Sequence, residues 1–191
     1  GLQGRKYRDE IYDSATASLR LGVHHRQNQT HWSFGTFARQ IWRKDEDDNV
    51  TIGLDAAVER YVSDRHSFFV NAVVEERQYP PSAGSDASFY SSQVGLRFTP
   101  AADMQLTFGA RFDANRPDTR HQGYDGHALF GRASKSWSGG IKTDIGLEIG
   151  SRDYRADFPL TADQRDDDYY RIDATLLTPR WSIYGFTPTT S

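Results

Sequence analysis

The stretch IKTDIGLEI, at residues 141–149, alternates between two kinds of side chain. The odd positions carry Ile, Thr or Leu, and the even positions carry Lys, Asp, Gly or Glu. A period of two predicts a β-strand whose two faces meet different surroundings. Similar segments recur along the chain, separated by turn-like stretches. This repetition is typical of a transmembrane β-barrel, with lipid outside and a polar lumen inside.

The same alternation predicts full strands along most of the chain, each long enough for a tilted bilayer crossing. The expected strands are residues 11–25, 31–43, 49–62, 66–79, 87–99, 104–115, 127–136, 141–154 and 168–178. Partial strands are expected at residues 5–8 and 181–186. We therefore expect an all-β fold: an antiparallel up-and-down transmembrane β-barrel, present here as an incomplete section of about 10 to 11 strands.

The connections between these strands alternate between short and long. The short ones are residues 26–30, 63–65, 100–103, 137–140 and 179–180, and the long ones are 44–48, 80–86, 116–126 and 155–167. Outer-membrane barrels have short periplasmic turns and longer extracellular loops. The pattern therefore assigns the long set to the cell exterior, and we expect the outer membrane of a Gram-negative bacterium as the location.

Composition narrows the class of protein. The chain has 191 residues, of which 37% are hydrophobic and 13% aromatic, and its mean hydropathy is -0.73. No apolar run approaches the roughly 20 residues of a membrane helix. The net charge of -3 gives no basic surface for nucleic acid, and the absence of cysteine rules out disulfides and thiolate metal sites. The high aromatic content suits girdles at the two membrane interfaces.

Enzymatic and metal sites find little support. No G-x-S-x-G motif marks a nucleophilic serine, so we expect no enzyme and no cofactor. The adjacent His24 and His25 would point to opposite faces of a strand, and no zinc-type histidine spacing occurs. Acidic runs at residues 45–48 and 163–168 do not follow the EF-hand pattern, and we interpret them as solvated loop residues rather than calcium ligands.

The candidate site is the polar face of the strands. Charges of both signs on one face suit a hydrated lumen or a network of ion pairs that braces it. The expected lumen-facing residues are Arg20, Asp55, Glu59, Glu75, Arg111, Asp113, Lys142, Asp144, Glu148 and Arg152. At three strand ends a tyrosine stands two residues after an arginine; these are Tyr7, Tyr79 and Tyr154. We expect these tyrosines to form an interface girdle next to lipid and lipopolysaccharide.

Three segments resemble the C-terminal barrel of the surface lipoprotein assembly modifier family. They are YDSATASLRLG (residues 12–22), DDDYYR (166–171) and WSIYGFTP (181–188), together with the Arg-x-Tyr strand ends. The resemblance implies a single outer-membrane barrel domain over residues 1–191 that helps lipoproteins reach the cell surface, with client lipoproteins as partners. The family's periplasmic tetratricopeptide domain and its last strands are absent, so the resemblance implies an incomplete barrel.

Two other functions remain open. A passive porin or solute channel would use the same polar lumen, and it predicts conductance by the complete barrel. A soluble lipocalin-like ligand-binding barrel would invert the faces, because its apolar residues would point inward. Behaviour in water without detergent distinguishes this last alternative from the two membrane proteins.

Overall fold

The protein is a single antiparallel β-sheet in the computed structural model, which describes residues 2–5, 14–43, 46–79, 86–119, 122–156, 165–178 and 189–190. The strands are β1 (Leu2–Arg5), β2 (Ser14–Gln27), β3 (Thr30–Arg43), β4 (Glu46–Ser63), β5 (His66–Gln78), β6 (Ala87–Ala101), β7 (Met104–Pro117), β8 (Tyr124–Ser136), β9 (Lys142–Tyr154), β10 (Asp166–Leu177) and β11 (Thr189–Thr190). One 3-10 helix, η3 (Ser138–Gly140), joins β8 to β9. No helix in the described part of the chain is long and apolar enough to cross a membrane.

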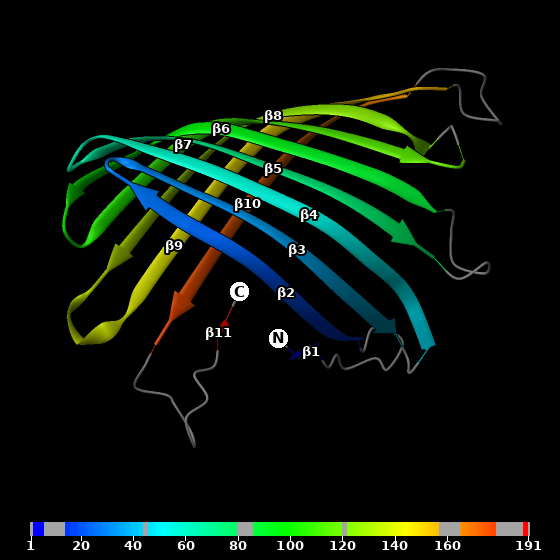
Figure 1. The fold of residues 1–191 in the computed structure, drawn as a ribbon, viewed down its shortest axis with the longest axis horizontal. Coiled ribbons are helices and arrows are strands. Elements are labelled where there is room, and N and C mark those ends of the chain that lie inside the picture. Colours follow the sequence, from blue (N-terminus) through cyan, green and yellow to red (C-terminus); the bar gives the residue numbers. More distant parts are fainter. Residues whose placement is uncertain are drawn as a thin grey trace.

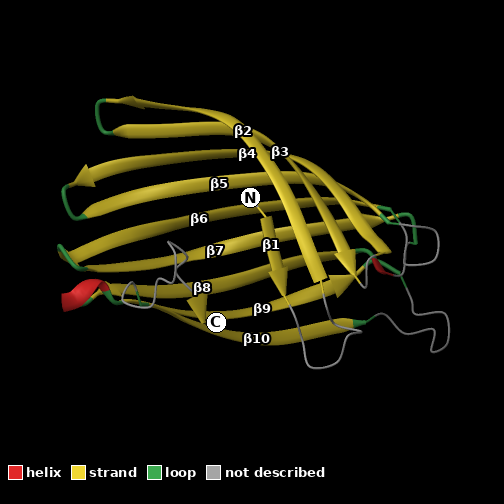
Figure 2. Ribbon diagram, turned by 90° about the horizontal axis from the view of Figure 1, so that it is seen from below, coloured by secondary structure: helices red, strands yellow, loops and turns green. Residues whose placement is uncertain are grey.

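The strands follow one another across the sheet in chain order, from β1 to β11. The expected all-β, up-and-down antiparallel architecture is therefore confirmed. Strands β2 to β10 contain 12 to 18 residues each, well above the roughly 5 to 6 that are usual in soluble proteins. The sheet curves strongly, and its hollow side is seen from below (Figures 1 and 2). In the described residues β1 and β11 do not pair with each other, so the sheet is open, as expected for an incomplete barrel.

Tight connections join β2 to β3, β4 to β5, β6 to β7 and β8 to β9, all at one end of the sheet (Figure 1). Asn28 adopts a φ of 54° in the first of these turns, a conformation that asparagine tolerates better than most residues. Gly139 and Gly140 both have a φ of 80° in η3, where a side chain would be strained. Residues 137–140, expected as a tight turn, thus form a short 3-10 turn.

The strand boundaries differ from the sequence expectation in a few places. The expected loop at residues 44–48 is shorter, because β4 already begins at Glu46 and a register shift between Ile41 and Trp42 accommodates the longer strand. Strand β8 begins at Tyr124 rather than at His127. The expected strands at 5–8 and 181–186 lie largely or wholly outside the described residues.

The two faces of the sheet reverse the usual pattern of burial. Leu19 is 63% exposed and Ile172 is 76% exposed, whereas Glu75 and Glu148 are each 9% exposed. In the described strands, the large exposed apolar side chains share the convex face, and the buried side chains share the concave face. The large apolar side chains of these strands therefore point mostly outward, while the most buried carboxylates, Glu75 and Glu148, lie on the concave side.

Candidate functional site

The concave face carries the ten residues that the sequence analysis selected as polar lumen candidates. Alternation and register place them all on this one face, because they occupy the even positions of β2 and β9 and the odd positions of β4, β5 and β7. Ion pairs involve Arg20, Asp55, Glu59, Glu75, Arg111, Asp113, Asp144 and Glu148. Lys142 and Arg152 lie near the two ends of β9, and Arg152 stacks on tyrosine rings.

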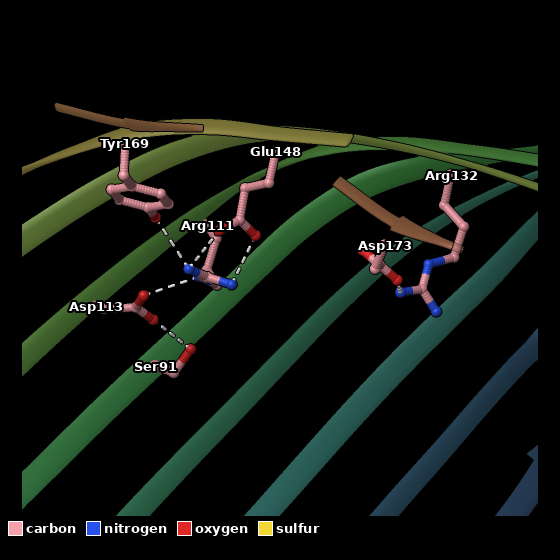
Figure 3. Close-up of polar contacts among 7 residues, drawn as sticks. All are labelled: Ser91, Arg111, Asp113, Arg132, Glu148, Tyr169 and Asp173. Atoms are coloured by element: carbon pink, nitrogen blue, oxygen red, sulfur yellow. Dashed lines mark hydrogen bonds and ion pairs between the residues drawn. The ribbon is translucent and has the colours of Figure 1, made fainter. Parts of the chain in front are cut away.

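Arg111, on β7, is the centre of the largest polar cluster (Figure 3). Its guanidinium donates to both carboxylate oxygens of Glu148 on β9, at 2.7 and 2.8 Å. It also donates to Asp113 Oδ2 at 2.8 Å and to the hydroxyl of Tyr169, on β10, at 3.0 Å. Ser91 completes the cluster by donating to Asp113 at 2.7 Å. The cluster connects β6, β7, β9 and β10.

A second arginine, Arg132 on β8, bridges two carboxylates in the same way. Its guanidinium lies 3.3 Å from Asp144 on β9 and 3.0 Å from Asp173 on β10. Ser134 donates to the same Asp144. Arg132 is half exposed, so this contact is more open to water than the one around Arg111.

Three ion pairs on the other half of the sheet join alternate strands. Arg20 pairs with Asp55 across β3, and Glu59 pairs with Arg97 across β5. A further, looser contact of 3.7 Å joins Arg39 to Glu75 across β4. Alternate strands of a flat sheet lie about 9.5 Å apart. Curvature brings side chains on the hollow side together, and it is this convergence that allows arginine to reach a carboxylate two strands away.

Glycines on the central strands make room for aromatic rings on the concave face. Phe69, Gly95, Gly109 and Phe130 lie opposite one another in a continuous row from β5 to β8. A Cβ atom at Gly95 would lie 2.6 Å from Cζ of Phe69, and one at Gly109 would lie 2.7 Å from Cζ of Phe130. The far end of each ring therefore covers its glycine, and Phe69 is only 5% exposed. Aromatic cover of a glycine across strands is a known device in curved sheets.

These features enclose a polar groove on the concave face. The groove has a volume of about 470 Å³ and extends from β5 to β10. Phe69 and Phe130 line it together with polar side chains that include Asn71, Gln93, Arg97, Arg111, Arg132 and Asp173. Charges of both signs and side-chain amides give a surface that hydrogen-bonds to water or to a polar chain without selecting one sign of charge.

Two of the three tyrosines expected in an interface girdle, Tyr79 and Tyr154, lie in the part of the chain that the structure describes. Tyr154 is at an even position of β9, on the same face as Glu148, and its ring lies 5.7 Å from that of Tyr124. Tyr79 follows β5 at the parity of the concave-face residues, and its N–H donates to Asp86 at 2.9 Å. Tyr7 lies outside the described residues. The Arg-x-Tyr spacing itself explains the parity of Tyr154, since residues two apart share a face and Arg152 faces the concave side.

Sequence reasoning omitted several members of the polar network. Arg97, Arg132 and Asp173 each have the parity of the concave face, so alternation could have identified them. Tyr169 shares the parity of Asp173 on β10, so alternation also places it on the concave face. Its contact with Arg111, three strands away, depends on curvature and does not follow from alternation. Among the described residues no cluster of three or more His, Cys, Asp or Glu side chains is arranged to hold a metal ion.

Comparison with known proteins gave one match. The family model described as surface lipoprotein assembly modifier matches residues 1–191, a range that includes every strand of the sheet. Comparisons with curated proteins and with solved structures found no significant match.

Proposed function

Because the chain belongs to the surface lipoprotein assembly modifier family, we propose that its sheet is part of an outer-membrane β-barrel that delivers lipoproteins to the cell surface. The proposed role is non-enzymatic. The barrel would contact outer-membrane lipid and lipopolysaccharide on its convex face and client lipoproteins on its concave face.

The observation that carries this proposal is the reversed burial of the two faces. Exposed apolar side chains cover the convex face along strands β2 to β10. A soluble protein rarely exposes so extensive an apolar surface, whereas lipid covers it at no cost. Strands of 12 to 18 residues also exceed the 9 to 11 or so that a tilted strand needs to cross the bilayer.

The polar groove supplies a path for a client polypeptide. Backbone amides that enter hydrocarbon without partners cost several kcal/mol each, so an exported chain needs a hydrated route. The groove offers mixed charges and amide groups along its length, including Arg111, Glu148 and Gln93. Its lack of one dominant charge suits a client of varied sequence better than it suits a selective ion channel.

The alternatives make different demands on these faces. A passive porin or solute channel also fits the polar groove, and it predicts stable conductance in planar bilayers. A lipocalin-like soluble barrel requires apolar residues on the concave side. The observed concave face carries Arg111 and Glu148 instead, which argues against a soluble ligand-binding barrel.

The proposal is tested in the native host by deleting the gene and restoring it in full length. We expect one or more lipoproteins to lose accessibility to protease on whole cells, while their total amount in the cell stays constant. Restoring the gene returns their display. Unchanged display of every surface lipoprotein in the deletion strain would contradict the proposal, and so would recovery of the protein outside the outer-membrane fraction.

A further inference from the structure

Cationic and aromatic side chains gather on the convex face at the end of the sheet where the tight turns lie. His25 and Trp32 form a ring pair with centroids 5.3 Å apart across β2 and β3. The Lys135 ammonium lies 4.4 Å from the centroid of the Trp137 ring. We define the basic–aromatic rim as these four residues together with Arg60 and with His66, whose ring stacks on Phe98 at 4.8 Å.

The cations of the basic–aromatic rim are available to a ligand. Arg60 is exposed, and the register places it between Thr30 and Phe68 on the convex face. Neither Arg60 nor Lys135 forms an ion pair with the described residues. The carboxylates of the strands near this end face the concave side, as Glu59 does. Asp64 and Asp103 lie in the turns themselves.

The opposite end of the convex face has the reverse charge. Its outward positions carry Glu76, Asp125, Asp153, Asp166 and Asp168. The arginines that share this edge, Arg116 and Arg155, both pair with Asp125, at a distance of 3.0 Å for Arg155. We call the exposed apolar side chains of the convex face the apolar belt. One edge of this belt carries Arg60 and Lys135, which form no ion pair with the described residues, and the other edge carries an excess of carboxylates.

We propose that the basic–aromatic rim binds the headgroup phosphates of anionic phospholipids in the leaflet at the tight-turn end. Tryptophan rings reside at the boundary between hydrocarbon and headgroups, which places Trp32 and Trp137 at that depth. Arg60 and Lys135 then lie at the level of the phosphates, and the carboxylates on the convex faces of the described strands lie at the opposite end of the sheet. This inference rests on the proposed function, because it requires the convex face to be in lipid.

The test uses the full-length protein in detergent micelles and native mass spectrometry. Phosphatidylglycerol and the zwitterionic phosphatidylcholine are titrated separately, and the bound lipid is counted for each. We expect phosphatidylglycerol to bind more tightly. Inorganic phosphate or glycerol 3-phosphate, added in excess, should not displace it, because the rim binds the phosphate as part of a lipid whose chains lie on the apolar belt.

Matched variants locate the site. R60Q/K135Q should weaken phosphatidylglycerol binding by about fivefold for each cation removed and leave phosphatidylcholine binding unchanged. R116Q/R155Q removes the same amount of charge at the opposite end and should have little effect. R60K/K135R retains both positive charges and should keep the preference for phosphatidylglycerol. This variant therefore distinguishes the effect of losing charge from the effect of a general loss of folding. Equal binding of both lipids by the native protein, or an undiminished preference in R60Q/K135Q, would overturn the inference.

The outcome is distinguishable from failure of the proposed function. A protein that fractionates with the outer membrane and displays lipoproteins, but shows no preference for phosphatidylglycerol, rejects only the lipid site. A protein that stays folded in water without detergent rejects both.

Discussion

Arg111→Ala tests whether the central ion-pair cluster holds the curved sheet together. The substitution removes a bidentate contact with Glu148 and a hydrogen bond to Asp113. The side chains of Arg111, Asp113 and Glu148 are 17%, 10% and 11% exposed, so two largely buried carboxylates lose their shared cation. Breaking a buried pair costs about 3 to 5 kcal/mol, and an exposed pair contributes at most about 1 kcal/mol.

The cost for Arg111→Ala should lie between these limits, because the groove admits water to the cluster. We expect the free energy of unfolding to fall by about 2 to 3 kcal/mol. The measurement is urea unfolding of the full-length protein in lipid vesicles, with the folded barrel detected by its faster migration on unheated gels. Arg20→Ala is the matched control, since Arg20 also pairs with a carboxylate two strands away but is 65% exposed.

A double-mutant cycle completes this test. Arg111→Ala/Glu148→Ala should cost less than the sum of the two single variants, because no uncompensated Glu148 carboxylate remains; a coupling of about 1 to 3 kcal/mol is expected. If Arg111→Ala and Arg20→Ala destabilise the protein equally, or if the two single effects simply add, the cluster does not support the sheet as argued.

Two further predictions concern the faces of the sheet. Gly95→Ala should lower the free energy of unfolding by about 1 to 3 kcal/mol in the same urea assay, because its Cβ would clash with the carbonyl oxygen of Phe108 and with the ring of Phe69. Gly131→Ala, whose Cβ would have ordinary contacts of 3.5 Å, should be tolerated. Leu147→Arg places a charge at the centre of the convex side of β9. If this face lies in lipid as proposed, the substitution should cost about 2 to 4 kcal/mol. Gln93→Arg in the groove should fold normally, and folding into vesicles measures both variants.

The long strands could be predicted from the sequence because each alternates for ten or more residues. Even β8, whose apolar face is little more than Leu129 and Ala133, follows the rule, and only its start was misplaced. The acidic run at the start of β4 was predicted as a loop, since charge alone does not distinguish a solvated strand from a turn. Its placement in a strand depends on pairing with β3.

The contacts of the candidate site were less predictable than its residues. Alternation assigns a side chain to a face, which was enough to bring Arg111, Asp113 and Glu148 together on one side. It does not give the register between strands, so the Phe69–Phe130 row over two glycines could not be anticipated. The concave-face parity of Tyr154 follows from that of Arg152, two residues earlier on β9.

The ion pairs between alternate strands also determine how the sheet can come apart. Each tight turn joins two strands into a hairpin, and the pairs Arg20–Asp55, Glu59–Arg97 and Arg111–Glu148 each connect one hairpin to the next. Such a pair forms only when the strand between its partners is already in place. Detaching any one of these hairpins therefore breaks an ion pair to its neighbour as well as the strand ladder between them. We expect the hairpins to unfold together rather than one at a time.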